Sequence, residues 1–440
     1  MMLGCRGLSA GAGKGRRVVV TGMGVVSPLG CGLEQSWSAL LAGECGMTRL
    51  PADRYGKLPC QVAALVPTGP GPGQLHISRC FSKSELRSMS LATAYALVAA
   101  DEALRAADWA PQEEEELCRT GVAVGMGMID LEDVAATSVA LHKSYNQVSP
   151  FFVPRVLVNM AAGHISIKYG FRGPNHAVST ACATGAHAIG DAFRFIKNGD
   201  ADVMVCGGTE ACVSPLAIAG FCRLRALSTS FNDSPGRASR PFDRDREGFV
   251  MGEGSAVLVL EELSHAVSRN ARIFAEVLGY GLSGDASHLT SPRADGSGAI
   301  LAMKRALGEA EVNIEDVGYI NAHATSTPVG DAIETRAIKM LFGEHAAGLA
   351  VSSTKGAHGH LLGAAGNLET VFTIMACSTS WLPPTINIEN LSEDMDLNYV
   401  ANVKQEWLAT AASKQRIALK NAFGFGGTNC SLCISQFTGT

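Results

Sequence analysis

Short apolar runs alternate with longer amphipathic stretches along this chain. Gly121–Met126, Asp202–Cys206 and Ser255–Leu260 are bounded runs that suit strands buried on both faces of a sheet. Ser84–Ala107 and Val158–Tyr169 have apolar residues at helical spacing. The alternation of the two patterns predicts an α/β protein.

The alternation begins again near residue 270. Glu262–Asn270 is a polar helical stretch, and Ile273–Leu278 is a new strand pattern. A chain of 440 residues exceeds the size at which one hydrophobic core usually stops growing. We therefore expect two halves, residues 17–270 and 271–440, although they show no repeat that can be aligned by eye.

The first residues are basic. No Asp or Glu precedes Glu34, whereas this segment contains Arg6, Lys14, Arg16 and Arg17. Such a composition is typical of the trimmed end of an organelle transit peptide, and an ordinary flexible terminus or a cloning remnant has the same pattern. We expect residues 1–16 to be a flexible N-terminal segment.

Composition and charge exclude several classes of protein. With 47% hydrophobic and 18% charged residues, the chain can bury a large core, which excludes disorder. A net charge of −5 provides no overall basic field for nucleic acid or an anionic membrane. No apolar run reaches the length of about 18 residues that a membrane span needs.

The 13 cysteines are scattered, which favours free thiols in a reducing compartment over a disulfide framework. Cys430 and Cys433 form a CxxC pair within an alternating apolar stretch. This context favours strand packing over half of a zinc site.

Cys182 has the sequence context of a catalytic nucleophile. It lies in Ser179–Gly185, between a strand-like His176–Val178 and a helical run over Gly185–Ile196. Small neighbours permit a strained strand-to-helix turn, and the dipole of the helix N-terminus favours thiolate over thiol. The alternative is a buried cysteine that acts as a small hydrophobe.

Two histidine segments follow strand patterns in the second half. His323 lies in the hydroxyl-rich segment Asn321–Pro328, which comes directly after Val317–Ile320, where open α/β sheets place their sites. His358 and His360 lie in the glycine-rich segment Ser352–Gly366. Their His-x-His spacing could suggest a metal, but no Asp, Glu or Cys lies close in sequence, so we expect no metal site.

Four motifs together resemble the elongating β-ketoacyl-[acyl-carrier-protein] synthases of type II, the acyltransferases of bacteria, plastids and mitochondria. They are Ser179-Thr180-Ala181-Cys182, His323-x-Thr-Ser-Thr-Pro328, Lys355 followed by Gly359-His-Leu-Leu-Gly-Ala-Ala-Gly366, and Asn421-x-Phe-Gly-Phe-Gly-Gly-Thr-Asn429. The similarity runs from about Arg17 to the C-terminus. It implies a thiolase-like fold, with two fused halves that each hold a mixed sheet between helices, and a homodimer.

The resemblance implies a decarboxylative Claisen condensation that elongates fatty acids by two carbons. Cys182 would carry the acyl group, and His323 and His360 would donate hydrogen bonds to the enolate oxygen. Lys355 and Glu334 match a buried polar pair of the family that orients the histidines. The alternative interpretation of these two residues is an ordinary internal ion pair.

The other site residues are implied in the same way. The backbone amides of Cys182 and Phe425 correspond to an oxyanion hole, and Phe425 also matches a gate that moves on acylation. Thr325 and Thr327 would bind the pantetheine amides. Ile129 and Phe221 match walls of the acyl pocket, with core or loop packing as the alternative. Ala324 and His358 depart from the family pattern, which commonly has glycine and threonine there, and we interpret His358 as a neutral local replacement.

The implied partner is an acidic acyl carrier protein, whose phosphopantetheine carries the substrates, so we expect no other cofactor. An acidic enzyme must meet it with local cations. Candidates are Lys83, Arg87, Arg223 and Arg225, with simple solvated surface as the alternative. The mitochondrial matrix is the compartment we expect, with the bacterial cytoplasm or a plastid as alternatives.

Related enzyme classes fit the motifs less well. A biosynthetic thiolase has a second cysteine in its last glycine-rich motif, where this chain has Thr428 and Asn429. The initiating synthases typically replace the second histidine by asparagine. A non-catalytic partner subunit, such as a chain-length factor, would lack the nucleophile.

Overall fold

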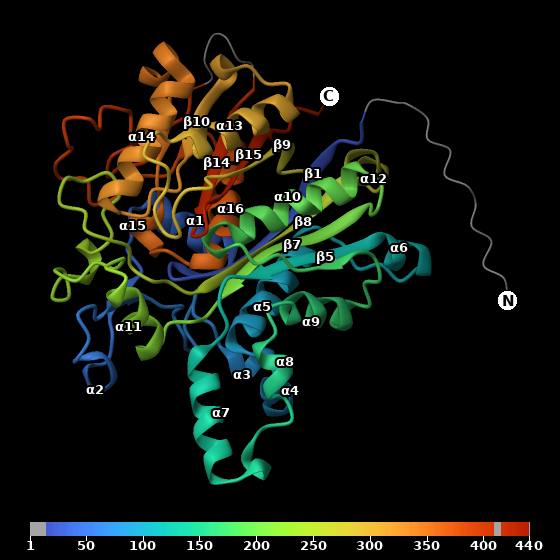
Figure 1. Ribbon diagram of the computed structural model, residues 1–440. Coiled ribbons are helices and arrows are strands. Elements are labelled where there is room, and N and C mark those ends of the chain that lie inside the picture. The colour runs from blue at the N-terminus through green and yellow to red at the C-terminus, as the bar shows by residue number, and fades with distance from the viewer. Residues whose placement is uncertain (1–14, 409–414, 440) are drawn as a thin grey trace.

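The computed structural model describes residues 15–408 and 415–439 and builds them around one large mixed sheet flanked by helices (Figure 1). Its strands in chain order are β1 (Val18–Ser27), β2 (Gly30–Cys31), β5 (Thr120–Met126), β6 (Asn175–His176), β7 (Val203–Glu210), β8 (Gly254–Glu262), β9 (Ala275–Gly284), β10 (Val317–Asn321), β11 (Ala350–Ser352), β14 (Ile417–Gly424) and β15 (Thr428–Gln436). Two small hairpin sheets pair β3 (Met47–Arg49) with β4 (Val62–Ala64) and β12 (Trp381–Leu382) with β13 (Gln405–Glu406).

The sheet contains the same topology twice. Its order is β11-β10-β14-β15-β9-β1-β8-β7-β5-β6, and β1 meets β9 at the centre. In the first half, β1 pairs antiparallel with β8, β8 antiparallel with β7, and β7, β5 and β6 are parallel. In the second half, β9, β15, β14, β10 and β11 repeat these directions in the same succession. The duplication that no sequence repeat revealed is therefore present in the strand order.

Helices cover both faces of the sheet. The longer ones are α1 (Leu33–Leu41), α5 (Leu91–Ala106), α7 (Leu131–Lys143), α9 (Met160–Tyr169), α10 (Thr184–Lys197), α11 (Pro215–Arg223), α13 (Ser297–Ala310), α14 (Pro328–Phe342) and α16 (Ala365–Thr379). Short helices are α2 (Ala52–Tyr55), α3 (Ile77–Cys80), α4 (Lys83–Ser88), α6 (Glu114–Arg119), α8 (Phe152–Val156), α12 (Leu263–Ser268) and α15 (Lys355–His358). None of the helices among the described residues is long and apolar enough to cross a membrane.

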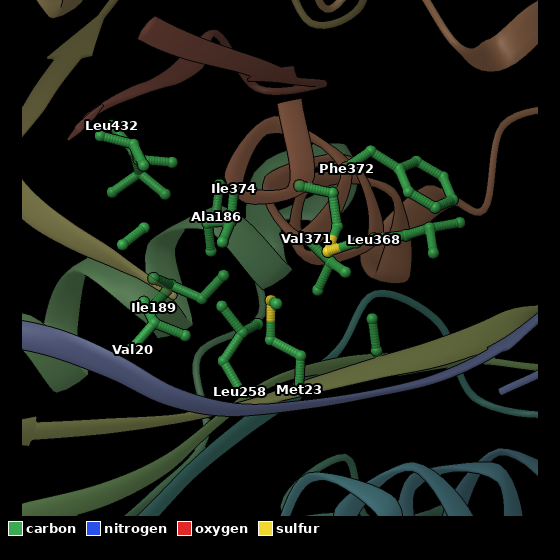
Figure 2. Close-up of a cluster of buried hydrophobic side chains, with 14 of the residues drawn as sticks. Val20, Met23, Ala186, Ile189, Leu258, Leu368, Val371, Phe372, Ile374 and Leu432 are labelled. Carbon is green, nitrogen blue, oxygen red and sulfur yellow. The ribbon is translucent and has the colours of Figure 1, made fainter. Parts of the chain in front are cut away.

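Helices α10 and α16 pack against each other in the interior. A Cβ on Gly366 would lie 2.8 Å from the backbone N of Ala186, so the two helices approach closely where they lack side chains. Figure 2 shows Ile189 of α10 and Val371 of α16 beside Met23 of β1 in the largest hydrophobic cluster. Burying each such side chain stabilises the fold by about 1.5–3 kcal/mol.

The predicted segments were found with two differences. The helix expected over Ser84–Ala107 is broken into α4 and α5, because Met89 is extended and the Ser90 side chain accepts a hydrogen bond from Thr93 N, which caps α5. At the N-terminus, residues 1–14 lie outside the described residues, whereas Arg16 forms an ion pair with Asp202.

Cys430 and Cys433 both lie in β15, three residues apart, so their side chains point to opposite faces of the sheet. They belong to two different hydrophobic clusters, in accord with strand packing. Two thiols on opposite faces cannot bind one metal ion.

Candidate active site

Cys182 lies on a strained turn between β6 and α10. A short 3-10 turn, Ala181–Ala183, leads directly into α10, and Ala181 has a φ of 49°, which L residues rarely adopt. The Thr184 hydroxyl stabilises this turn, since it accepts from Thr180 N at 2.8 Å and donates to Ala181 O at 2.8 Å. The predicted strand-to-helix turn is therefore present, with Cys182 at its apex.

Burial opposes ionisation of the nucleophile. It raises the pKa of Cys182 to about 12, although the positive charge of Lys355 acts in the opposite direction. Cys182 directly precedes the N-terminus of α10, whose dipole acts against this desolvation and favours thiolate.

His323 follows β10, and polar groups fix its backbone from both sides. The Glu334 carboxylate, from α14, accepts from His323 N at 2.9 Å and from Ala324 N at 2.7 Å. The Lys355 ammonium donates to His323 O at 2.6 Å. The position of this histidine therefore depends on α14 and α15 together.

His360 is fixed against the first half of the chain. Its N donates to Val250 O at 2.7 Å and its O accepts from Gly252 N at 2.9 Å. The ring lies edge to face with Phe249, at 5.2 Å between centroids, and with His323, at 5.5 Å. The two histidines are thus adjacent, with perpendicular rings.

Both imidazoles are uncharged at neutral pH. Burial, reinforced by the charge of Lys355, lowers the pKa of His323 and of His360 well below 6.5. Within the described part of the chain, the Nδ1 atom of each ring is buried without a hydrogen-bond partner. Neutral rings can donate a hydrogen bond without protonating a nearby carbanion.

Among the described residues, Lys355 and Glu334 do not form an ion pair with each other; both contact the backbone of His323, and their orienting role stays a prediction. Lys355 pairs instead with Glu369 of α16, at 2.5 Å, and Glu369 is shared with Lys420 of β14, at 2.8 Å. Glu334 accepts from backbone amides and from Asn421 Nδ2 at 3.1 Å. The correct partners lie on elements that only the fold brings together.

Glu369 and Lys420 are the residues that the sequence analysis missed. Glu369 is the one charged residue in the sequence of α16, and Lys420 interrupts a buried strand directly before the last motif. A charged residue within an apolar element almost always has a partner when it is buried. That signal was available in the sequence.

A cavity of about 310 Å³ joins the predicted reactive groups. Its lining includes Cys182, His323, His360, Thr325, Thr327 and Phe425. The Thr325 and Thr327 hydroxyls lie 3.2 Å apart on one wall. Residues far apart in sequence, from both halves, therefore share one space.

Two predicted pocket walls lie outside this lining. Phe221 packs on Phe249, with centroids 5.6 Å apart, in the hydrophobic cluster that contains Cys182. Ile129 is half-buried in the segment between β5 and α7. A wall role remains a prediction for both residues, with Phe221 the better placed.

The predicted carrier-docking cations fall into two groups. Arg223 and Arg225 are exposed at the end of α11, and Arg225 lines the cavity. Lys83 and Arg87 are exposed on α4 and lie outside the lining.

His358 is buried and lies outside the cavity lining. Its Nε2 lies 2.8 Å from the Thr354 hydroxyl, and its ring packs on Phe372 at 5.8 Å. Burial lowers the pKa of His358 to about 4, so it is neutral. These contacts support a local packing role.

The comparisons with known proteins agree on one family. A family model for the N-terminal domain of β-ketoacyl synthases matches residues 15–266, and one for the C-terminal domain matches residues 274–389. The mitochondrial 3-oxoacyl-[acyl-carrier-protein] synthase of Arabidopsis thaliana is 51% identical over 96% of this chain and 93% of its own length.

A protein of Schizosaccharomyces pombe, named as a putative mitochondrial 3-oxoacyl-[acyl-carrier-protein] synthase, is 46% identical over 96% of this chain and 99% of its own length. Among solved structures, a ketosynthase in complex with its type II polyketide acyl-carrier protein matches with a TM-score of 0.84 and 30% identity. That match covers 97% of this chain and 100% of the other.

Proposed function

This chain belongs to the β-ketoacyl synthase family, and we propose that it is a 3-oxoacyl-[acyl-carrier-protein] synthase that lengthens acyl chains by two carbons. The observation that carries the proposal is the meeting of Cys182, His323 and His360 in one buried cavity. A nucleophile and two neutral hydrogen-bond donors are what a condensation through an enolate requires.

The first step is acyl transfer to Cys182. The sulfur attacks the carbonyl carbon of an acyl-carrier thioester, a new C–S bond forms, and the carrier thiol leaves with the proton that the cysteine loses. The charge on the tetrahedral oxygen is stabilised by the backbone amides of Cys182 and Phe425, both at the cavity. The Phe425 side chain is the proposed gate to this space.

The second step uses a malonyl-carrier thioester. Its C–C bond to the carboxylate breaks, carbon dioxide leaves, and the electron pair remains as an enolate whose oxygen accepts from His323 and His360. The enolate carbon attacks the acyl-cysteine thioester, the C–S bond to Cys182 breaks, and the thiolate takes up one proton. The product is a 3-oxoacyl-carrier thioester.

Glu334 and Lys355 act through His323 in this proposal. One receives the backbone N–H of His323 and the other donates to its carbonyl, so the ring is held in place while charge develops. Thr325 and Thr327 are placed to bind the amides of the pantetheine arm. No cofactor other than this arm takes part in the proposed steps.

The proposed partner is an acidic acyl carrier protein. The solved ketosynthase complex supports a carrier partner, and Arg223 and Arg225 offer cations beside the cavity. We also assign Lys83 and Arg87 to carrier docking, on α4 and outside the cavity lining. Replacing Arg225 by Glu should raise KM for carrier-bound substrates several-fold at low salt and leave kcat nearly unchanged.

The proposed assembly is a homodimer. Large apolar side chains are exposed along α7, α8 and their connection, among them Val139 (57%), Tyr145 (81%) and Val153 (59%). Figure 1 shows α7 and α8 projecting away from the body of the molecule. Such a patch on a projecting arm suits contact with a second copy of the chain.

The proposed compartment is the mitochondrion. Its support is the name of the relatives from Arabidopsis thaliana and Schizosaccharomyces pombe, together with the basic residues that precede Glu34. Import of the tagged full-length protein into isolated mitochondria would test it, and retention outside the organelle would contradict it.

A reconstituted assay tests the function. Purified protein is mixed with octanoyl-carrier protein and malonyl-carrier protein, and the 3-oxodecanoyl product and carbon dioxide are measured by mass spectrometry. Product formation is expected. Absence of turnover, with Cys182 unacylated for every chain length offered, would replace this proposal by a non-catalytic partner subunit.

A further inference from the structure

Lys420 is a buried lysine that the steps above do not use. It lies within β14, one residue before Asn421, and its side chain is fully buried. Taking an ammonium group out of water costs several kcal/mol unless it is paired. A lysine at this position of a core strand therefore has to be explained by its contacts.

Lys420 completes an ion-pair chain that ends at His323. Its ammonium lies 2.8 Å from Glu369 Oε2, while Glu369 Oε1 lies 2.5 Å from the ammonium of Lys355. Lys355 in turn donates to the carbonyl of His323. Because each lysine holds one oxygen, the carboxylate cannot rotate away from Lys355 without breaking the contact with Lys420.

Two ammonium groups and two carboxyl groups lie close together around Lys420. They belong to Lys355 and Lys420, and to Glu369 and Glu334. The charged and titratable groups that face Lys420 come from several elements, namely Glu369 (α16), Lys355 and His358 (α15), Glu334 (α14), Cys430 (β15), and His323 and His360 at the cavity.

The positive charge of Lys420 also acts on both cavity histidines. After burial and Lys355, it contributes to the lowered pKa of His323 and of His360. A fixed cation in a dry interior acts over longer distances than one in water. Lys420 can therefore influence the reaction without contacting a substrate.

We propose that Lys420 is a positioning residue for the condensation. It fixes Glu369 so that Lys355 stays in contact with the His323 carbonyl. It also supplies a second positive charge near the two histidines. This inference rests on the proposed function of the same site. It assigns a role to a residue that the four sequence motifs do not contain.

Two variants at Lys420 and Glu369 test the proposal. In Lys420→Met, Glu369 loses one of its two cations. In the double variant Lys420→Met/Glu369→Gln, one positive and one negative charge are removed, so the net buried charge is unchanged, but Lys355 also loses its carboxylate partner. Lys197→Met/Glu309→Gln removes an ion pair of 3.0 Å away from the cavity and is the matched control.

Two half-reactions are measured for each variant, namely malonyl decarboxylation between pH 5 and 9 and acylation of Cys182 by intact-protein mass. Removing Lys420 should raise the pKa of the histidines, so they protonate at higher pH. The acid limb of decarboxylation should then move towards higher pH, and the loss of decarboxylation rate should be largest at the acid end of this range. Acylation should change by no more than about two-fold.

A change confined to decarboxylation distinguishes a positioning role from a merely structural one. If decarboxylation by both variants matches the wild type in rate and in pH profile, the proposal is overturned. Equal losses in both half-reactions would also contradict it. If wild-type protein itself gave no turnover, the proposed function would fail instead, so the two failures are distinguishable.

Discussion

The two halves of the molecule contain the same turn and use it differently. In the first half, β6 leads into a 3-10 turn and then α10; in the second, β11 leads through α15 into a 3-10 turn, Leu362–Ala364, and then α16. Ala181 has a φ of 49° and Leu362 a φ of 47°, at equivalent positions of the two turns. The next residue is Cys182 in one turn and Gly363 in the other.

The difference follows from what each turn faces. Cys182 faces the cavity, whereas a Cβ on Gly363 would lie 2.3 Å from the backbone N of Gly127. Gly363 N and Gly127 N both donate to the Glu210 carboxylate, at 3.0 and 3.1 Å. One turn carries the proposed nucleophile and the other joins the halves, so neither half alone contains the proposed site.

The largest effect should come from making the first turn resemble the second. Cys182→Ala removes the sulfur that forms the thioester, so condensation should fall by at least about 10³-fold. The reconstituted assay measures this, and Cys222→Ala, in the same hydrophobic cluster, is the control and should keep its activity. Full activity of Cys182→Ala would remove this cysteine from the mechanism.

Glu369 distinguishes the two central helices, because α10 has Ala188 at the equivalent position. Burial alone would raise the pKa of Glu369, but Lys355 and Lys420 outweigh it and lower the pKa to about 2. Glu369→Gln removes the carboxylate that two buried lysines share and should lower the free energy of unfolding by about 3–5 kcal/mol at pH 7.

The pH dependence of this effect has a defined sign. Because the pKa of Glu369 is lowered by folding, its contribution is present above about pH 4.5 and is lost as the pH falls towards about 2. Denaturant titrations should show that the difference in the free energy of unfolding between the wild type and Glu369→Gln becomes smaller as the pH falls over that range. A difference that stayed constant with pH would contradict the ion-pair chain, and Glu309→Gln serves as a half-exposed control.

The histidines of the second half should differ from each other. His360→Ala removes a donor at the cavity and should slow decarboxylation by about 10²–10³-fold while Cys182 is still acylated. His358→Ala changes only packing and the Thr354 contact, and a loss below about ten-fold is expected. Comparable losses in decarboxylation from both variants would show that His358 takes part in the chemistry.

The smallest effect on the protein is expected when a side chain is added at Gly363 in the second turn. Gly363→Ala forces its Cβ against Gly127 and should lower the free energy of unfolding by about 1–3 kcal/mol. Gly308→Ala, in α13 with open space around it, should instead stabilise by about 0.5–1 kcal/mol. The thermal unfolding of both variants measures this difference. An unchanged stability of Gly363→Ala would contradict the close packing of Gly363 on Gly127.

Local patterns were sufficient for the elements and for the reactive residues. Strands such as Gly121–Met126 and Val317–Ile320 were predicted within one residue at each end, because a buried strand is a continuous apolar run. The strained turn at Cys182 was visible from its small neighbours. The break between α4 and α5 was missed, since a single serine cap outweighed the helical spacing.

By itself, the sequence determined the alternation of strands and helices, and its resemblance to a family selected Cys182, His323 and His360 as the candidate reactive residues. Only the tertiary structure decided that Lys355 pairs with Glu369, which Lys420 shares, and that the halves repeat one topology. The physical reason is that ion pairing in a dry interior depends on strand order and helix packing, which bring together side chains that no local pattern connects.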